Sequence, residues 1–175
     1  MQSDRVLKFD YRGAPQTISV MRMAALQAQT DPAVRELAEL ACSGLESKDY
    51  LSEYIAIYYF VLSRTRYMRD PKTVELLRSP ALIARAILNG ETPNLDCDDL
   101  ACLIAALLLA VGAQCDFVTV AFRRMTFQGV QQYSHVLCRA LEPKTNQHIL
   151  LDPVAAEKTS QMRSRCVAVK IWPIA

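Results

Sequence analysis

A run of 16 residues without a charge, Leu100–Cys115, constrains the fold more than any other part of the chain. It directly follows the acidic segment 96–99, which contains Cys97. The run is too short to span a membrane, so we expect a buried central helix. Asp96 is placed to cap this helix, with another aspartate three residues later, as in an acidic variant of the capping box. Gly112 is a stop signal, so the predicted helix ends near it.

The 175-residue chain has a globular composition, with 51% hydrophobic and 22% charged residues. This length is sufficient for one domain with a real core. Because the central helix needs a sheet to cover it, we expect a single domain over residues 1–175. Within it, residues 1–92 are predicted to be mainly helical, and residues 93–175 to hold the central helix and antiparallel strands.

The N-terminal part contains several helix signals. Apolar spacing, caps and breakers predict helices over residues 17–29, 33–42, 48–65 and 80–89. Asp31 and Ser47 are the predicted caps of the second and third of these. The third carries a stripe that is predicted to be core, formed by Tyr50, Tyr54, Ile57, Tyr58 and Val61. Residues 91–95, which include a proline, are predicted to be a loop.

The C-terminal part contains β-branched and aromatic segments. They predict strands over residues 115–122, 132–141, 147–151 and 166–172. Helices followed by a meander of strands indicate an α+β fold, with the central helix packed on an antiparallel sheet.

Three residues at the edges of different predicted elements suggest chemistry. Cys97 starts the central helix, His135 lies in a strand, and Asp152 ends another strand. This is the layout of a thiol nucleophile, its base and the residue that orients the base. The helix N-terminus and a protonated His135 would both favour the thiolate. The backbone N–H of Cys97 is a candidate oxyanion donor.

The surroundings of Cys97 also raise an objection. Asp96, Asp98 and Asp99 oppose formation of a thiolate, and we expect His135 to outweigh them only if it touches the sulfur. Taken one at a time, Cys97, His135 and Asp152 each have a purely structural explanation, since cysteines at helix starts and histidines within strands are common. The combination is more specific than its parts.

Several classes of function are disfavoured. A net charge of +2 does not indicate a nucleic-acid partner. The N-terminus lacks a signal peptide, and the six cysteines form no Cys-x-x-Cys pair, so we expect reduced thiols and cytoplasmic synthesis. Cys97, His135 and Asp152 are three unlike ligands without paired spacing, so no metal or other cofactor is expected.

The residues of this constellation resemble the transglutaminase-like superfamily. The resemblance lies in residues 96–112, in Tyr133-Ser134-His135-Val136 and in Leu151-Asp152-Pro153-Val154. It implies a papain-like core with a catalytic triad of Cys97, His135 and Asp152. The segments 48–51 and 66–71 are similar to small transglutaminase-like proteins of tailed bacteriophages and prophages, which implies an association with a virion.

The chain departs from this superfamily at three points. Leu95 replaces the usual glycine before the Asp-Cys pair, Leu137 stands where an aromatic residue is common, and Ile149-Leu150 precede the final motif without an aromatic residue. Tyr67 and Asn94 are candidates for a side-chain oxyanion donor. These departures affect the catalytic role more than the fold.

Two functions follow from the resemblance. The first is a cysteine hydrolase or acyltransferase that acts on the amide bonds of a peptide or of peptidoglycan. The second is a non-catalytic assembly protein of a phage head, neck or tail, which would bind other virion proteins and reuse the papain-like scaffold. We favour the enzyme, while a small-molecule binding protein is a weaker third possibility.

Overall fold

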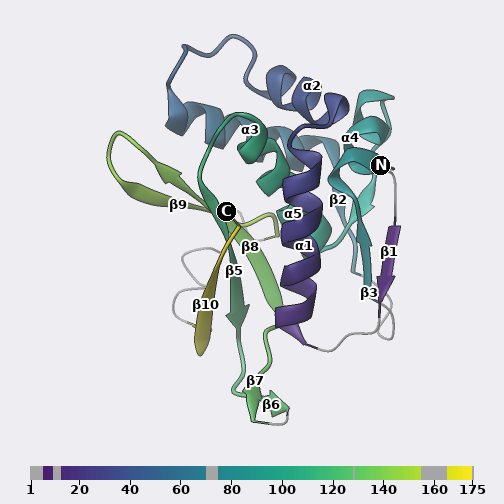
Figure 1. The fold of residues 1–175 in the computed structure, drawn as a ribbon, viewed down its shortest axis with the longest axis vertical. Coiled ribbons are helices and arrows are strands. Elements are labelled where there is room, and N and C mark those ends of the chain that lie inside the picture. The colour runs from purple at the N-terminus through teal and green to yellow at the C-terminus, as the bar shows by residue number, and fades with distance from the viewer. Residues whose placement is uncertain (1–5, 10–12, 70–74, 128, 155–164, 175) are drawn as a thin grey trace.

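The computed structural model describes residues 6–9, 13–69, 75–127, 129–154 and 165–174. These residues form helices on one side and a four-stranded antiparallel sheet on the other, with one helix between them (Figure 1). The helices of the described residues are α1 (Ala14–Ala28), α2 (Pro32–Ala41), α3 (Tyr50–Arg64), α4 (Pro80–Leu88) and α5 (Cys97–Ala110). No helix within these ranges combines the length and apolarity that crossing a membrane requires.

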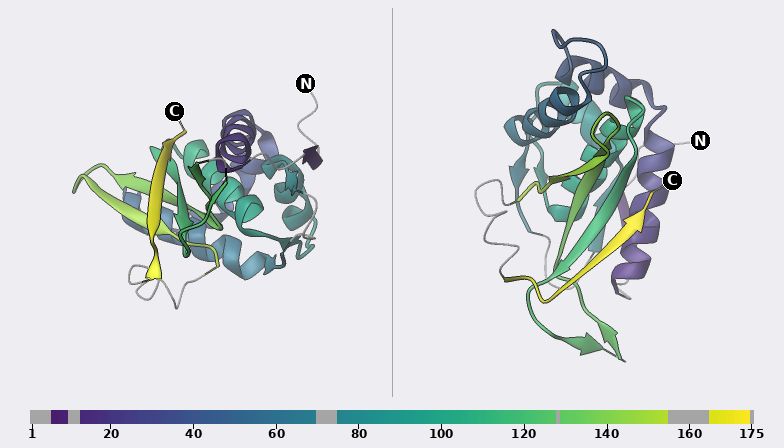
Figure 2. Two further views of the ribbon diagram at one scale, coloured as in Figure 1. Left: turned by 90° about the horizontal axis from the view of Figure 1, so that it is seen from below. Right: turned by 90° about the vertical axis from the view of Figure 1, so that its left-hand side faces the viewer.

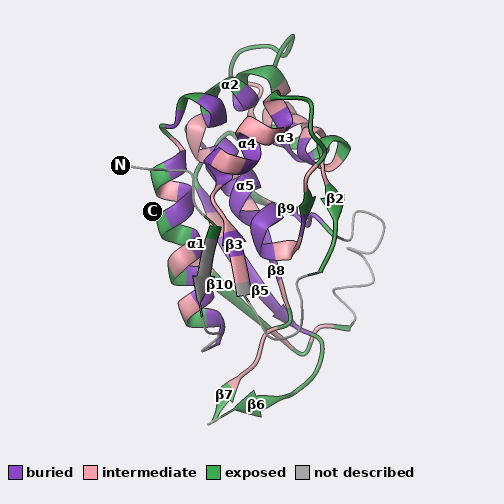
Figure 3. Ribbon diagram, turned by 90° about the vertical axis from the view of Figure 1, so that its right-hand side faces the viewer, coloured by how far each residue is buried: buried purple, intermediate pink, exposed green. Residues whose placement is uncertain are grey.

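Helix α5 is the centre of the fold, as the uncharged run predicted. Every residue from Asp98 to Leu108 is buried, so the helix is covered on all its faces (Figure 3). The Asp96 carboxylate caps it by accepting a 3.2 Å hydrogen bond from the Asp99 N–H. Gly112 adopts the left-handed conformation just beyond its end, with φ of 83°. Both predicted ends of the helix are confirmed.

The sheet covers one side of α5. Its strand order is β10 (Ala168–Pro173), β5 (Cys115–Ala121), β8 (His135–Glu142) and β9 (Gln147–Leu151), with all neighbours antiparallel. Cys138 and Ala140 of β8 are fully buried in the same apolar cluster as α5. The predicted α+β fold, with a central helix packed on an antiparallel sheet, is confirmed. The apolar cluster contains residues from both the N-terminal and the C-terminal part of the chain. The predicted division into parts 1–92 and 93–175 stays a prediction.

The remaining helices cover the other sides of α5 (Figure 2). In α3 the predicted core stripe is mostly correct, because Tyr54, Ile57, Tyr58 and Val61 are buried. The predicted cap was wrong: Asp49, and not Ser47, caps α3 by accepting a 3.4 Å hydrogen bond from the Ser52 N–H. Helix α3 therefore begins later than the apolar spacing indicated.

Short strands interrupt the helical part, which the sequence did not predict. Two of them pair in parallel, β2 (Arg66–Tyr67) with β4 (Asn94–Leu95). The structure thereby corrects the predicted loop over residues 91–95. Strands β1 (Val6–Phe9) and β3 (Glu75–Arg78) form an antiparallel pair. Strands β6 (Thr126–Phe127) and β7 (Val130–Gln131) form a hairpin that projects from the body (Figure 1).

Candidate active site

Cys97 is the first residue of α5, and two elements fix its position. The Asp96 cap holds the first turn of the helix. Just before it, the parallel pair of β2 and β4 places Tyr67 beside Leu95, and the Met68 N–H donates a 2.8 Å hydrogen bond to the Leu95 carbonyl. The thiol is half-buried and, like the other five cysteines, forms no disulfide. Cys97 is thus held from both sides, by the paired strands β2 and β4 before it and by the capped first turn of α5 after it.

The surroundings of Cys97 favour the neutral thiol. Burial raises the pKa of the Cys97 thiol well above its ordinary value, and the charges of Asp98 and Asp96 raise it further. The backbone N–H groups of Val136 and of Cys97 itself act in the opposite direction. The expected stabilisation of a thiolate is therefore not met, because burial and the flanking carboxylates outweigh the helix N-terminus.

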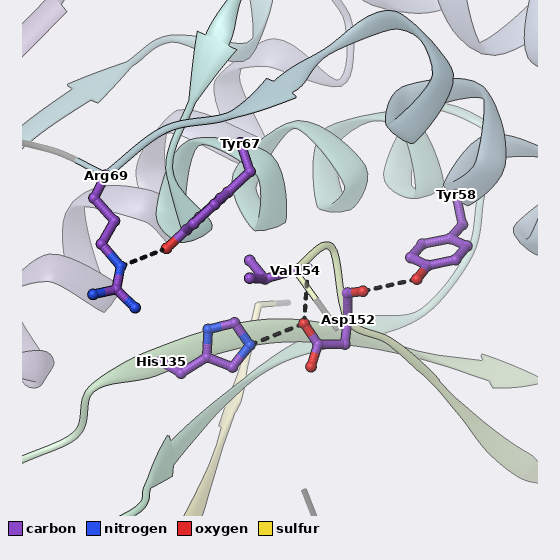
Figure 4. A network of polar contacts seen from close by, with 6 residues as sticks. All are labelled: Tyr58, Tyr67, Arg69, His135, Asp152 and Val154. Carbon is purple, nitrogen blue, oxygen red and sulfur yellow. Dashed lines mark hydrogen bonds and ion pairs between the residues drawn. The ribbon is translucent and has the colours of Figure 1, made fainter. Parts of the chain in front are cut away.

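His135 and Asp152 lie together at one end of the sheet. Because β8 and β9 are antiparallel, the start of β8 and the end of β9 lie at the same end of the sheet. Cys138 pairs with Leu151, so Asp152 follows on opposite Leu137, whose side chain shares a face of β8 with that of His135. His135 Nε2 is 2.9 Å from Asp152 Oδ1, and the two side chains are 10% and 1% exposed (Figure 4). The same Oδ1 accepts a 3.0 Å hydrogen bond from the Val154 N–H. This carboxylate therefore holds the imidazole ring in a fixed orientation.

Asp152 has a second anchor, which the sequence did not reveal. The hydroxyl of Tyr58 donates a 2.8 Å hydrogen bond to the Asp152 backbone carbonyl (Figure 4). Burial, followed by the nearby Asp152 charge, raises the pKa of Tyr58 to about 12. Sequence periodicity placed Tyr58 in the core, but it gives no information about what the hydroxyl binds.

The structure brings Cys97 close to the strand that carries His135, but not into a hydrogen bond with its ring. The sulfur interacts with the N–H of Val136, the residue after His135. Within the described residues, no hydrogen bond joins the Cys97 sulfur to His135. The ring nitrogen Nδ1, which Asp152 does not use, points away from that carboxylate (Figure 4). Phe122 stacks against the imidazole, with 6.4 Å between ring centroids and 26° between planes.

The candidate oxyanion donors lie on the adjacent strands β2 and β4. Tyr67 and Asn94 are both exposed. The Tyr67 hydroxyl accepts a 3.4 Å hydrogen bond from Nε of Arg69, a residue that sequence reasoning did not single out (Figure 4). The Asn94 carbonyl accepts a hydrogen bond from Arg78. The contact of Tyr67 is thus made by its side-chain hydroxyl, whereas that of Asn94 is made by its backbone carbonyl.

The side chains of this region suit acyl chemistry at sulfur. They include a thiol at a helix N-terminus and an imidazole held by a buried carboxylate, which are the groups needed for nucleophilic attack and proton transfer. Among the described residues, no group of three or more His, Cys, Asp or Glu side chains is placed to hold a metal ion.

Comparisons with known proteins give a likeness of fold. No protein-family model matches the chain, and no curated protein matches it in sequence. A candidate cysteine protease from Cytophaga hutchinsonii aligns with 95% of this chain and 57% of its own, at 15% identity and a TM-score of 0.52. A candidate protease from Parabacteroides distasonis aligns with 76% of this chain and 26% of its own, at 10% identity and a TM-score of 0.48.

The chain thus spans just over half of the Cytophaga structure and about a quarter of the Parabacteroides structure. At 15% identity, the Cytophaga match shows the fold alone. The alignment over 95% of this chain takes in the helices, the central helix α5 and the antiparallel sheet. The chain therefore has an α+β fold similar to that of the Cytophaga structure.

Proposed function

We propose that this chain is a cysteine hydrolase or acyltransferase that acts on amide bonds through Cys97, His135 and Asp152. The observation that carries the proposal is the 2.9 Å contact between His135 Nε2 and Asp152 Oδ1. It lies at the end of the sheet where the Val136 N–H meets the Cys97 sulfur at the start of α5. The fold likeness to a cysteine-protease structure supports the same chemistry. Peptides, including those of peptidoglycan, are the proposed substrates.

In the first step, the Cys97 sulfur attacks the carbonyl carbon of the amide. Because the surroundings favour a neutral thiol, a base must remove its proton as the attack proceeds. With Asp152 accepting from Nε2–H, Nδ1 of His135 has the lone pair that takes this proton. The mechanism requires Nδ1 and the thiol to be in contact in the substrate complex, where catalytic contacts often tighten.

In the second step, the protonated His135 donates its proton to the leaving nitrogen, the C–N bond breaks, and a thioester remains on Cys97. Water or another amine then attacks the thioester and regenerates the thiol. The buried Asp152 carboxylate stabilises the imidazolium between these steps. Water gives a carboxylic acid and an amine gives a new amide, so one site serves both hydrolysis and transfer.

The reactivity of Cys97 tests this proposal without a known substrate. We expect iodoacetamide to label Cys97 more slowly in His135→Ala than in the unmodified protein, because the thiol loses its base. His148→Ala is the matched control, since His148 is the other histidine and is exposed on β9. Mass spectrometry of the Cys97 peptide gives the rate, with Cys166 as an internal reference. Equal rates for the unmodified protein and His135→Ala would contradict the proposal.

A turnover assay then separates hydrolysis from transfer. The protein would be incubated with dimethylated casein or peptidoglycan peptides and a fluorescent primary amine. New amino termini report hydrolysis, and fluorescence attached to the acceptor reports transfer. Both signals should disappear in Cys97→Ser.

The raised pKa of Cys97 favours a second candidate, a non-catalytic assembly protein. This role and the association with a phage virion rest on the sequence resemblance. Under it, Cys97→Ala in a phage would leave infectivity and particle assembly intact, whereas a required enzyme would lose function with the same substitution.

A further inference from the structure

Arg69 stands at the edge of the candidate site without a role in the mechanism. Tyr67 is the last residue of β2, and Arg69 follows it by two residues. Arg66 precedes Tyr67 in the strand, so its side chain lies on the opposite face. A 3.4 Å hydrogen bond from Arg69 Nε to the Tyr67 hydroxyl joins the side chains of these two residues. Because Tyr67 pairs with Leu95, it lies next to the residues that lead into Cys97.

The parallel pairing of β2 with β4 brings Arg69 near the thiol. Tyr67 pairs with Leu95, the Met68 N–H donates to the Leu95 carbonyl, and Arg69 and Cys97 each follow two residues after the paired residues. The hydrogen bond with Tyr67 raises the pKa of the Arg69 guanidinium. Figure 4 shows the guanidinium beyond the Tyr67 hydroxyl, on the side of His135 from which Nδ1 projects. A cation, a thiol and a candidate base therefore border the same region.

The guanidinium retains hydrogen-bonding capacity. Arg69 is exposed, and its recorded hydrogen bond uses Nε alone. Within the described part of the chain, it forms no ion pair with a carboxylate. The neighbouring acids have other contacts: Asp96 caps α5, and Asp99 accepts a 2.7 Å hydrogen bond from the Arg78 N–H. The two Nη groups thus remain available as a planar fork of donors.

We infer that Arg69 binds a carboxylate of the substrate next to the amide bond that Cys97 attacks. This inference rests on the proposed function and specifies its substrate class, which is peptides with an acidic group beside the scissile bond. A guanidinium fork matches a carboxylate in two parallel hydrogen bonds, and Tyr67 fixes its Nε edge. The carboxylate belongs either to an acidic side chain or to the C-terminus of the peptide.

A pair of thiol reagents of nearly equal size tests the inference. Iodoacetate carries a carboxylate and iodoacetamide is neutral, and both react with the same thiolate. The ratio of their rates at Cys97 therefore cancels any change in the pKa of the thiol. We expect Arg69→Gln to lower the ratio of iodoacetate to iodoacetamide by about two- to fivefold, as for an exposed ion pair, and the difference to shrink in high salt.

Arg66→Gln is the matched control and should leave the ratio unchanged, because Arg66 is an exposed arginine of β2 on the face opposite to that of Tyr67. An unchanged ratio in Arg69→Gln, an equal loss in Arg66→Gln, or failure of both reagents to reach Cys97 would overturn the inference. These outcomes are separate from the His135→Ala labelling rate, which tests the proposed function itself.

Three small amides identify the source of the carboxylate by protecting Cys97 from iodoacetamide. N-acetylglutamate amide offers a side-chain carboxylate, N-acetylglutamine offers a terminal one, and N-acetylglutamine amide offers neither. Stronger protection by one of the two acids than by the neutral amide, abolished in Arg69→Gln, assigns the source. Equal protection by all three compounds, or none by any, would overturn carboxylate recognition.

Discussion

The Tyr58 hydroxyl donates a 2.8 Å hydrogen bond to the backbone carbonyl of Asp152, across 94 residues of sequence. This bond connects helix α3 to the residue that holds His135. The Asp152 side chain is 1% exposed, so its carbonyl and carboxylate are both positioned by protein groups and not by solvent. Helix α3 therefore contributes to the candidate site without supplying a reacting group.

Tyr58→Phe should weaken both stability and reactivity. The substitution leaves the Asp152 carbonyl buried without this donor, so we expect a loss of about 1 kcal/mol in the free energy of unfolding. It should also slow iodoacetamide labelling of Cys97, because Asp152 and His135 lose an anchor. Urea denaturation and labelling kinetics measure the two effects. Tyr59→Phe is the control, since Tyr59 is 60% exposed, and an equal effect there would contradict the prediction.

The raised pKa of Tyr58 predicts a loss of stability at high pH. Folding raises this pKa from its usual value near 10 to about 12, so the folded state favours the protonated phenol. The stabilisation is complete below the unfolded pKa and is lost as pH rises toward the folded one. Between pH 10 and 12, the unmodified protein should therefore lose more stability than Tyr58→Phe. Parallel urea titrations at several pH values measure this difference, and identical pH profiles would refute it.

Asp96→Asn should make Cys97 more reactive. Asparagine caps helices as well as aspartate does, so the first turn of α5 should persist. Removing the Asp96 charge lowers the pKa of the thiol, and iodoacetamide labelling at neutral pH should accelerate. Asp49→Asn changes another helix-capping carboxylate, at α3, and should have no effect on this rate. A slower reaction of Cys97 in Asp96→Asn would show that the charge of this carboxylate does not control the thiol.

Gly112→Ala should destabilise the fold by about 1 kcal/mol, because residue 112 has φ of 83° and alanine is strained there. No atom lies within 4 Å of a Cβ built at this position, so the cost is conformational and not steric. Gly112→Asn should cost less, since asparagine tolerates this conformation. Urea denaturation gives the comparison, and equal losses in the two variants would mean that something other than backbone conformation is responsible.

The sequence predicted local features well and long-range ones only in part. The cap at Asp96 and the stop at Gly112 depend on neighbouring residues, and both are correct. The contact between His135 and Asp152 depends on how β8 and β9 pair. A sequence predicts such pairing only where a turn-rich link joins two recognisable strands.

Other parts of the site gave no usable signal. Strands β2 and β4 have two residues each, too few for alternation to appear, so Leu95 was assigned to a loop. Arg69 directly precedes Asp70-Pro71, a dipeptide typical of a turn, so its position in the sequence does not indicate a functional role. The helical spacing of Tyr58 predicts its burial but not the partner of its hydroxyl. Each of these features depends on contacts between segments that are remote in sequence.

The burial of residues 98–108 of α5 determines which parts of the site are able to move. These residues present no exposed face, so sliding or rotating the helix would expose hydrocarbon. The backbone at Cys97 is consequently fixed in place. Substrate entry is therefore expected to move the side of Tyr67 and Arg69, where the two-residue strand β2 pairs, within the described part of the chain, with β4 alone.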